Sequence, residues 1–506
     1  MTMDLNSGSK RASPLWRNEG TKGILKGLFV SVSMGCSTVG LAAILPSFWV
    51  AGLAAVIVAP FLIALGVTRN VLLALTLVWL NEAFFGVGGN WIVLGPVNGR
   101  ALLLLCLVVA FLWARLLSKQ TIAKETTRNQ WVLFYALALP AFLVVYSIII
   151  KGVYWSAALS DVNRFAVILG YFPVCYLLKK LRWFVVGWLL GASGLLAVLY
   201  TVLAATHSSV TSVLLEKWVG VYSDMGNWNL ITNVIDTGRA SFTPLIFGMI
   251  GLFLGLVLAV ARRDWLAKTA GFCIMLVAAF SFVINFTRGP LAGIFIALLV
   301  LLVGLLLAAE WLPAIKIATI IIAFSAGGVL YTVNYLPNSS GKWEIRGMNL
   351  EEILDPVRIE QMQLMLQAWR EEPVLGTGVG SPVANYSRTD EGEGLAFEDQ
   401  YPMLLYRTGI VGFVLILAPF ILFIFRSLQF IVTSPGLARS PEAVINLAMC
   451  GAVISLLVAS AFNPYFATSM MIIFMDIFMA SDSAIKFPLA RKERRLPSKK
   501  ESPKYA

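Results

Sequence analysis

The sequence PLAGIFIALLVLLVGLLLAA, residues 290–309, contains twenty consecutive residues without a charge. A helix needs about 20 apolar residues to cross the hydrocarbon core of a bilayer. Similar runs recur along the chain of 506 residues, of which 58% are hydrophobic and 13% charged, with a mean hydropathy of +0.81. Because a soluble domain carries about a quarter charged residues, the sequence predicts an all-α protein that crosses a membrane many times.

Fourteen apolar segments are predicted to span the membrane. The first eleven lie within residues 24–333 and the last three within residues 401–481. A polar loop of residues 334–400 separates the two groups, and basic tails of residues 1–23 and 482–506 flank them. The predicted spans are residues 24–45, 47–66, 70–86, 100–117, 131–150, 162–178, 183–205, 241–261, 266–286, 290–309, 312–333, 401–425, 442–462 and 464–481.

The distribution of lysine and arginine predicts how these spans are oriented. With the N-terminus in the cytoplasm, alternating spans place 27 of the 39 Lys and Arg residues on the cytoplasmic side, as the positive-inside rule requires. Both termini are then cytoplasmic. The net charge of +12 follows from this topology and does not indicate nucleic-acid binding. We expect the basic run from Lys486 to Lys504 to be a topology signal that also contacts anionic lipid head groups.

The polar loop 334–400 is therefore expected on the external face. It contains 12 of the 27 acidic residues and only five Lys or Arg. A long polar loop is usually functional, since an idle connection would be short. Asp355 and Pro356 suit the cap and first turn of a helix, which we expect to be amphipathic and to end near Glu372. Helical spacing predicts one inward face for Arg358, Met362, Met365 and Trp369.

Two further features follow this predicted helix. Alternating glycines allow a sharp turn or a close approach of the backbone to a ligand, and three are present: Gly376, Gly378 and Gly380. Glu398 and Asp399 then precede the span that begins at Tyr401. These two acids are candidates for a general base. They equally suit the N-terminus of a helix, where the dipole favours negative charge.

Two arginines stand at the external ends of spans. Arg288 lies between two apolar stretches in Asn285-Phe286-Thr287-Arg288-Gly289-Pro290, and Arg239 lies just before the span 241–261. A charge at the bilayer edge is costly unless it is paired, faces a water-filled cavity or snorkels to the interface. No acid lies near Arg288 in sequence, so we expect its partner to be an anionic ligand. The alternative is a purely interfacial anchor.

Cysteine and histidine give little indication of redox or metal chemistry. The single histidine, His207, has no cluster of ligands around it, so a zinc site is not expected. The five cysteines lie in apolar segments without a CxxC spacing and are interpreted as small core residues: Cys36, Cys106, Cys175, Cys273 and Cys450.

Taken in order, these motifs resemble those of the O-antigen polymerase and O-antigen ligase superfamily of membrane glycosyltransferases. The resemblance covers roughly residues 230–415 and rests on four pieces. They are Arg239 before a span, the turn Thr287-Arg288-Gly289, the loop helix with Arg358, Trp369 and Pro373 to Gly380, and the pair Glu398-Asp399 followed by Gly409 and Gly412.

The resemblance implies a transferase of the bacterial inner membrane that uses an undecaprenyl-diphosphate-linked sugar donor and needs no metal or cofactor. Arg288 and Arg239 would bind the diphosphate and Arg358 would add a contact, because guanidinium groups suit phosphate oxygens. Trp369, Tyr401 and the three glycines would contact the substrates. A flippase and a chain-length regulator of the same pathway are implied as partners, together with the lipid-linked acceptor and membrane lipids.

The chain departs from this family in one motif, and one other class of protein is an alternative. Where ligases tend to carry His-Asn, this chain has Glu398-Asp399, which favours a polymerase of O-antigen, capsule or exopolysaccharide over a ligase. A transporter is the alternative from another class. Transporters usually carry ionisable groups near the bilayer midplane. Only Glu82 and Asp476 fit that description here, and neither has an obvious partner in the sequence.

Overall fold

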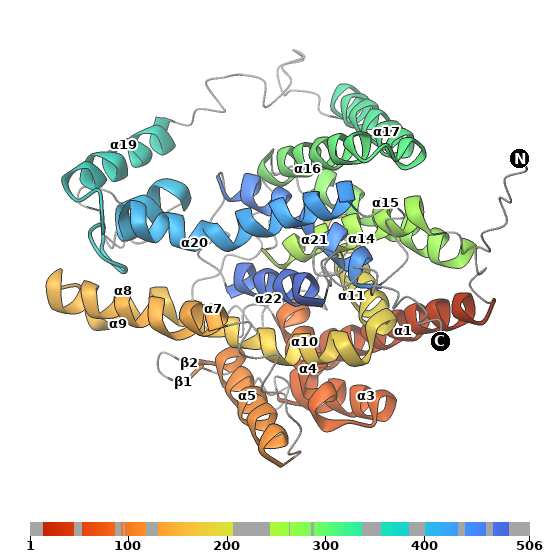
Figure 1. Cartoon of the computed structure of the whole chain (residues 1–506), viewed down its shortest axis with the longest axis horizontal. Helices are drawn as coiled ribbons and strands as arrows, with labels where there is room; N and C mark the ends of the chain where they lie inside the picture. The colour runs from red at the N-terminus through yellow and green to blue at the C-terminus, as the bar shows by residue number, and fades with distance from the viewer. Residues whose placement is uncertain are drawn as a thin grey trace, which may run out of the picture.

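A computed structural model of the chain describes twelve segments. They are residues 14–44, 53–86, 93–94, 97–117, 130–205, 243–262, 264–284, 288–335, 356–383, 400–433, 441–461 and 469–484. Within them the regular secondary structure is helical apart from one hairpin, in which β1 (Val93–Leu94) pairs antiparallel with β2 (Val97–Asn98). Figure 1 shows the helices packed around one another in a single bundle.

The first half of the bundle ends at residue 205. Its α-helices are α1 (Pro14–Ile44), α3 (Ala59–Thr68), α4 (Val71–Phe85), α5 (Gly99–Leu117), α7 (Gln130–Leu133), α8 (Leu139–Val145), α9 (Trp155–Val162), α10 (Tyr171–Lys180) and α11 (Arg182–Ala205). The π-helical turns η1 (Leu53–Val58), η4 (Phe134–Ala138) and η5 (Tyr146–Ile150) and the 3₁₀ segment η6 (Asn163–Gly170) continue these helices.

The second half begins with the 3₁₀ turn η7 (Thr243–Phe247). The helices that follow are α14 (Gly248–Ala261), α15 (Trp265–Ile284), α16 (Arg288–Leu307), α17 (Trp311–Tyr335), α19 (Pro356–Glu371), α20 (Gln400–Thr433), α21 (Pro441–Ser460) and α22 (Ser469–Ala484). Each of the fourteen predicted spans overlaps a helical segment of one half or the other. The predicted loop helix corresponds to α19, so its start at Pro356 and its end near Glu372 are confirmed.

Length and composition support the predicted multi-pass membrane protein. In the described residues six helices are long and apolar enough to cross a bilayer: Gly20–Leu41, Arg182–Val202, Trp265–Val283, Gly289–Leu307, Gln400–Thr433 and Ala443–Ser460. The remaining predicted spans coincide with shorter apolar helices, with helices interrupted by π or 3₁₀ turns, or, for residues 464–481, with the 16-residue helix α22.

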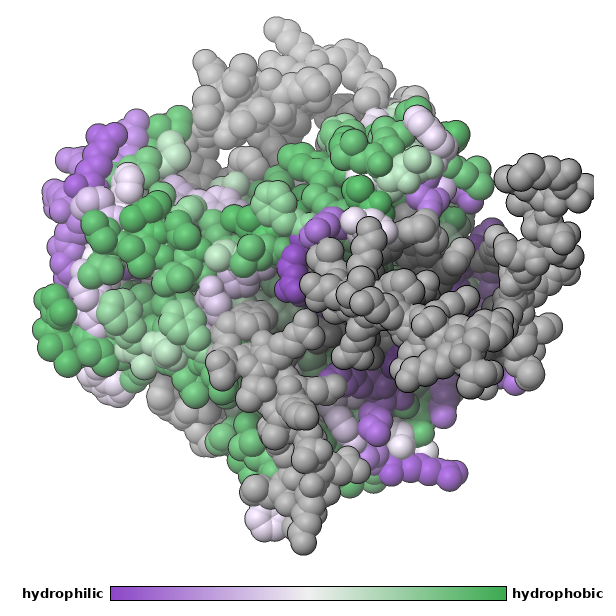
Figure 2. All heavy atoms as spheres, viewed as in Figure 1, coloured by the Kyte–Doolittle hydropathy of each residue, from purple (hydrophilic) through white to green (hydrophobic). Residues whose placement is uncertain are grey.

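The bundle has a buried centre and an apolar outer surface. Helices α14, α21 and α22 are buried along most of their length. Outer helices instead expose large apolar side chains, as Ile149 of η5 at 75% and Phe425 of α20 at 67% illustrate. Figure 2 shows broad apolar areas on the visible face. A surface of this kind suits contact with lipid, since soluble proteins rarely expose large apolar patches.

The loop helix α19 lies at one end of the bundle. In Figure 1 it is on the left, beside the first turns of α20 and above the tip formed by α8 and α9, whereas α1 begins on the right. Contacts between α19 and α20 agree with this view. The chain between α8 and α9 turns at Lys151, where Tyr154 and Trp155 are exposed. Exposed aromatic rings beside a lipid-facing surface are typical of the membrane–water interface.

Glu82 has a partner, contrary to the expectation from the sequence. Its carboxylate, in the last turn of α4, accepts a hydrogen bond from Nε of Arg100 at 2.6 Å and another from Nη2 at 3.2 Å. Both side chains are buried, with at most 1% exposed. The hairpin β1–β2 lies between the two residues in the chain and brings the start of α5 back to the end of α4. The sequence showed no partner because eighteen residues separate them.

The pair Glu82–Arg100 allows a direct test of this packing. Glu82→Gln or Arg100→Met alone leaves a buried charge unpaired, so we expect each to lower stability by about 3–5 kcal/mol. The double variant Glu82→Gln/Arg100→Met removes both charges and should lose less than the sum of the single changes. Thermal unfolding of the purified protein in detergent measures the three effects. Strictly additive losses would contradict the pairing.

Candidate functional site

The candidate site begins at a kink in α20. Gly409 has φ 62° and ψ −174°, which is outside the helical region and interrupts the helix. A kink removes helical hydrogen bonds, so main-chain groups on both sides of Gly409 need other partners. Within an apolar segment water is a poor substitute, because unsatisfied backbone groups cost several kcal/mol there.

The chain after α19 supplies those partners. We call residues 373–381 the clasp. The amides of Ile410 and Val411 donate to the carbonyl oxygens of Pro373 and Val374, at 2.9 and 3.2 Å. In return, the clasp amides at residues 377 and 378 donate to the carbonyl oxygens of residues 406 and 407, at 2.9 and 3.0 Å. The clasp and the kink therefore satisfy each other through four main-chain hydrogen bonds.

Two glycines make this approach possible. Gly376 has φ 72°, and a Cβ placed there would lie 2.5 Å from the amide nitrogen of Gly409. A Cβ at Gly409 would lie 2.2 Å from the carbonyl oxygen of Val374. Any side chain at either position would separate the two backbones. The alternating glycines had indicated a sharp turn or a close approach of the backbone to a ligand, and in the structure the segment closely approaches the backbone of α20.

The clasp also binds the helices of the first half. The amide of Val379 donates to Oγ of Ser147 at 2.8 Å, and the amide of Gly380 donates to Oδ2 of Asp161 at 2.9 Å. Oη of Tyr146 donates to the carbonyl oxygen of Gly376 at 2.9 Å. Segments more than 200 residues apart thus meet at the clasp.

A buried ion pair lies at the centre of these contacts. Nη1 of Arg407 donates to Oδ2 of Asp161 at 2.5 Å, and that oxygen also accepts from the amide of Gly380. The Arg407 side chain is 5% exposed and that of Asp161 is 18% exposed. Nη2 of Arg407 further donates to the carbonyl oxygen of Ser381 at 3.4 Å. One carboxylate and one guanidinium therefore join α9, α20 and the clasp.

Every amide from residue 376 to residue 381 has a partner within the protein. Besides the four bonds already described, the amide of Gly376 donates to the carbonyl oxygen of Glu372, and the amide of Ser381 to that of Gly378. No amide in this run is available to a phosphate oxygen. The packing explains the glycines, and the predicted ligand contacts at Gly376, Gly378 and Gly380 remain a prediction.

The inner face of α19 differs in detail from the predicted one. Met365 is fully buried as expected, but Met362 is 38% exposed, and Gln361 is buried instead. The predicted face is therefore wrong at Met362 and confirmed at Met365. Neither amide atom of Gln361 has a hydrogen-bond partner among the described residues. An unpaired buried amide is costly, so this side chain is a candidate for ligand binding that the sequence did not indicate.

An exposed ion pair borders the clasp on its outer side. The ammonium of Lys151 contacts the carboxylate of Glu372 and lies over the ring of Tyr146, with Nζ 5.6 Å from the ring centroid. The hydrogen bond to Glu372 raises the pKa of Lys151. Trp369 is partly exposed, and its Nε1 donates to the carbonyl oxygen of Pro373 at 3.1 Å. The last turn of α19 is thus tied to the clasp.

The first turns of α16 and α20 converge on the last turns of α21. Oη of Tyr401 donates to the carbonyl oxygen of Leu457 at 2.5 Å. A Cβ at Gly293 would lie 2.2 Å from the carbonyl oxygen of Ser455, so α16 packs closely against α21 there. Arg288 opens α16 five positions before Gly293.

Most of the predicted site side chains lie outside the described residues. These are Arg239, Glu398 and Asp399, together with the side chains of Arg288 and Arg358, whose backbones belong to α16 and α19. Glu398 and Asp399 immediately precede α20. In the described part of the chain no three His, Cys, Asp or Glu side chains are grouped as metal ligands.

Sequence reasoning named neither Asp161 nor Arg407 as a site residue. Both are single charges near the ends of apolar segments, and such charges usually find a partner. The sequence therefore indicated that each of the two residues has a partner, but not which residue that partner is. Their pairing depends on the fold of segments 246 residues apart.

Alanine at the glycines of the clasp and kink tests the backbone pairing. Gly152 provides a matched control, since it also has a positive φ, of 67°, but open space around its Cα. Gly152→Ala should cost only the left-handed conformation, about 1–2 kcal/mol. Gly376→Ala and Gly409→Ala must also displace backbone, so we expect a larger loss of thermal stability and faster trypsin cleavage at the exposed Arg370. Equal behaviour of all three variants would contradict the pairing.

Comparison with known proteins gives no match from which the role of this site could be assigned. No model of a known protein family matches the chain, and no curated protein matches it significantly. The interpretation therefore rests on the residues of this chain. In the described residues the site has three features. They are the clasp docked on the kink of α20, the pair Asp161–Arg407, and the contacts of α16 and α20 with α21 at one end of the bundle.

Proposed function

We propose that the protein is a membrane glycosyltransferase that polymerises undecaprenyl-diphosphate-linked oligosaccharide units into O-antigen, capsule or exopolysaccharide. The observation that carries the proposal is the convergence of α16 and α20 on the end of α21, with α19 docked beside them. Arg288 opens α16, and Glu398 and Asp399 directly precede α20. A predicted phosphate-binding residue and a predicted base thus belong to neighbouring helix ends.

The proposed orientation puts this end of the bundle on the external face of the bacterial inner membrane. Fourteen spans then leave both termini in the cytoplasm, in agreement with the distribution of Lys and Arg. The exposed Tyr154 and Trp155, near the clasp, suit the outer membrane–water interface. The polyprenyl tail of the donor would remain in the bilayer and hold its diphosphate at the same level.

The arginines would act on the leaving group. As the bond between the anomeric carbon and the diphosphate oxygen breaks, negative charge develops on the undecaprenyl diphosphate. Arg288 and Arg239 would stabilise that charge, with Arg358 on α19 as a third contact, because guanidinium groups bind phosphate oxygens through two parallel hydrogen bonds. Such stabilisation is strongest where water is excluded.

A carboxylate would activate the acceptor. In the proposed step a hydroxyl of a second lipid-linked unit attacks the anomeric carbon, its oxygen forms the new glycosidic bond, and its proton passes to Glu398 or Asp399. No metal or cofactor is needed to balance this reaction. The buried amide of Gln361 offers one donor group and one acceptor to sugar hydroxyls at the inner face of α19. A flippase would supply the donor, and a chain-length regulator would act on the product.

Separate substitutions of Arg288 and Glu398 test the proposal. In cells that lack the native gene, we expect Arg288→Ala to lower polymer formation by about 10²–10³-fold and Glu398→Gln by about 10²–10⁴-fold. Single lipid-linked units should accumulate. Arg370→Ala and Glu360→Gln are the matched controls, because both side chains are exposed on α19, and they should leave the polymer unchanged. Glycan gels and membrane-fraction blots would measure product and insertion.

The same experiment separates the alternatives. Long polymer that forms but stays on the lipid carrier would favour an O-antigen-type ligase. Unchanged glycans in both variants would overturn the proposed site. A transporter is favoured by one observation, the fully buried Asp476 of α22, which packs against Gly170 and has no cationic partner among the described residues. Loss of export in Asp476→Asn with a normal Arg288→Ala variant would select that function.

A further inference from the structure

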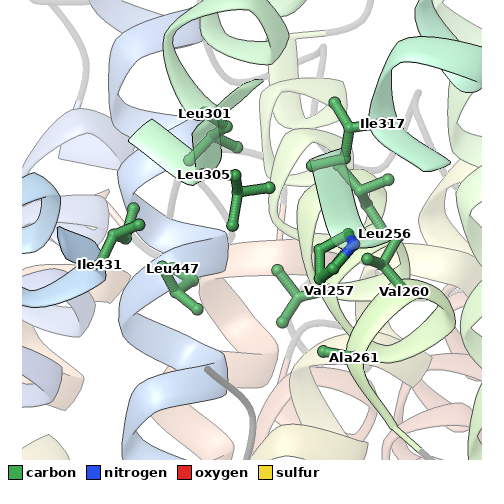
Figure 3. Close-up of a pocket in the computed structure, with 10 residues that line it drawn as sticks. Leu256, Val257, Val260, Ala261, Leu301, Leu305, Ile317, Ile431 and Leu447 are labelled. Carbon is green, nitrogen blue, oxygen red and sulfur yellow. The ribbon is translucent and has the colours of Figure 1, made fainter. Parts of the chain in front are cut away.

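An apolar crevice lies far from the clasp, between α14, α16, α17, α20 and α21. It is partly open to the surroundings, and its empty space, counted together with the open solvent at its mouth, is about 440 Å³. Figure 3 shows side chains from α14 and α17 facing those from α16, α20 and α21 across this space. All of the lining residues are apolar: Leu256, Val257, Val260, Ala261, Leu301, Leu305, Pro313, Ile317, Ile431 and Leu447.

The position of these residues in their helices places the crevice at the other end of the bundle. Ala261 is the last residue of α14, Leu305 and Ile431 lie in the last turn of α16 and of α20, and Pro313 lies in the first turn of α17. In the proposed orientation this end faces the cytoplasm. The crevice therefore lies at the depth of the cytoplasmic leaflet, opposite the proposed catalytic face.

The surface around the crevice is also apolar. Leu306, next to the lining residue Leu305, is 41% exposed, and Leu312 and Ile315, on either side of the lining residue Pro313, are 65% and 61% exposed. Such side chains suit contact with lipid tails rather than water. Water inside the crevice would find no polar side chain among the lining residues, and apolar cavities of this kind stay dry or take up apolar ligands.

The cation Lys316 stands at the edge of this apolar surface. Lys316 precedes the lining residue Ile317 and is partly buried, and its Nζ donates to the carbonyl oxygen of the lining residue Val260 at 3.3 Å. A lysine beside an apolar crevice at a membrane edge keeps its stem in the apolar region and its ammonium near head groups. Basic pockets between helices on the cytoplasmic side bind anionic lipid head groups.

We propose that this crevice is a binding site for an anionic phospholipid of the cytoplasmic leaflet. Part of one hydrocarbon chain enters the space between α14, α16 and α20, and Lys316 binds the lipid phosphate. The bound chain replaces missing van der Waals contacts among the ends of five helices. This site is independent of the proposed catalytic chemistry, because it uses no residue of the external end.

Lipid binding by the purified full-length protein tests the proposal. In detergent, phosphatidylglycerol should raise the unfolding temperature more than phosphatidylcholine does, since a ligand that binds the native state stabilises it. Native mass spectrometry should show retained phosphatidylglycerol. Leu305→Trp fills the crevice and should reduce retention several-fold, whereas Leu306→Trp, next to it but exposed, should not.

Lys316→Gln keeps the crevice open and tests the head-group contact without a risk to core packing. It should abolish the preference for phosphatidylglycerol over phosphatidylcholine, while Lys268→Gln, another lysine at the same end, should preserve it. Equal retention by the two tryptophan variants would overturn the crevice as the site. An unchanged lipid preference in Lys316→Gln would overturn the phosphate contact. Displacement of phosphatidylglycerol by equimolar undecaprenyl phosphate would overturn the assigned lipid.

Discussion

The kink of α20 at Gly409 leaves main-chain groups without helical partners inside a segment apolar enough to cross the membrane. Irregular backbone at such a position needs protein partners, because lipid offers none. The clasp supplies them through Pro373, Val374 and its own amides. This requirement explains why the chain after α19 docks on α20. It also explains why residues 376 and 409 are glycines. The polar loop is therefore anchored at the end of α19 that joins the clasp.

Two ion pairs, one fully buried and one partly buried, join helices in different ways. Glu82 and Arg100 join two helices that are neighbours in sequence, whereas Asp161 and Arg407 join the two halves of the chain. Asp161 also accepts from Gly380, so its carboxylate has more than one partner, as a buried charge requires.

The sequence predicted where helices form, but not which residues of different helices contact one another. Each predicted span overlaps a helical segment, six of the described helices are long and apolar enough to cross a bilayer, and the Asp355-Pro356 signal located the start of α19, because these features depend on local composition. Pairings such as Asp161 with Arg407 and Glu82 with Arg100 depend on tertiary packing, which no single-sequence pattern encodes. The glycine-rich segment was recognised as a place of close approach, but its partner in the structure, the backbone of α20, could not be read from spacing. The inner face of α19 was predicted correctly at Met365 but not at Met362, because the polar residue Gln361 is buried there instead.

The proposed transferase would use the end of the bundle that these interactions organise. The most direct test is glycan transfer by the purified protein in lipid nanodiscs, with undecaprenyl-diphosphate-linked repeat units as the only substrate. The account predicts that lipid-linked oligomers of two and more units appear and that undecaprenyl diphosphate is released in equal number to the new bonds, without nucleotide sugar or divalent metal. Intact single units after prolonged incubation with folded protein, with no diphosphate released, would contradict it.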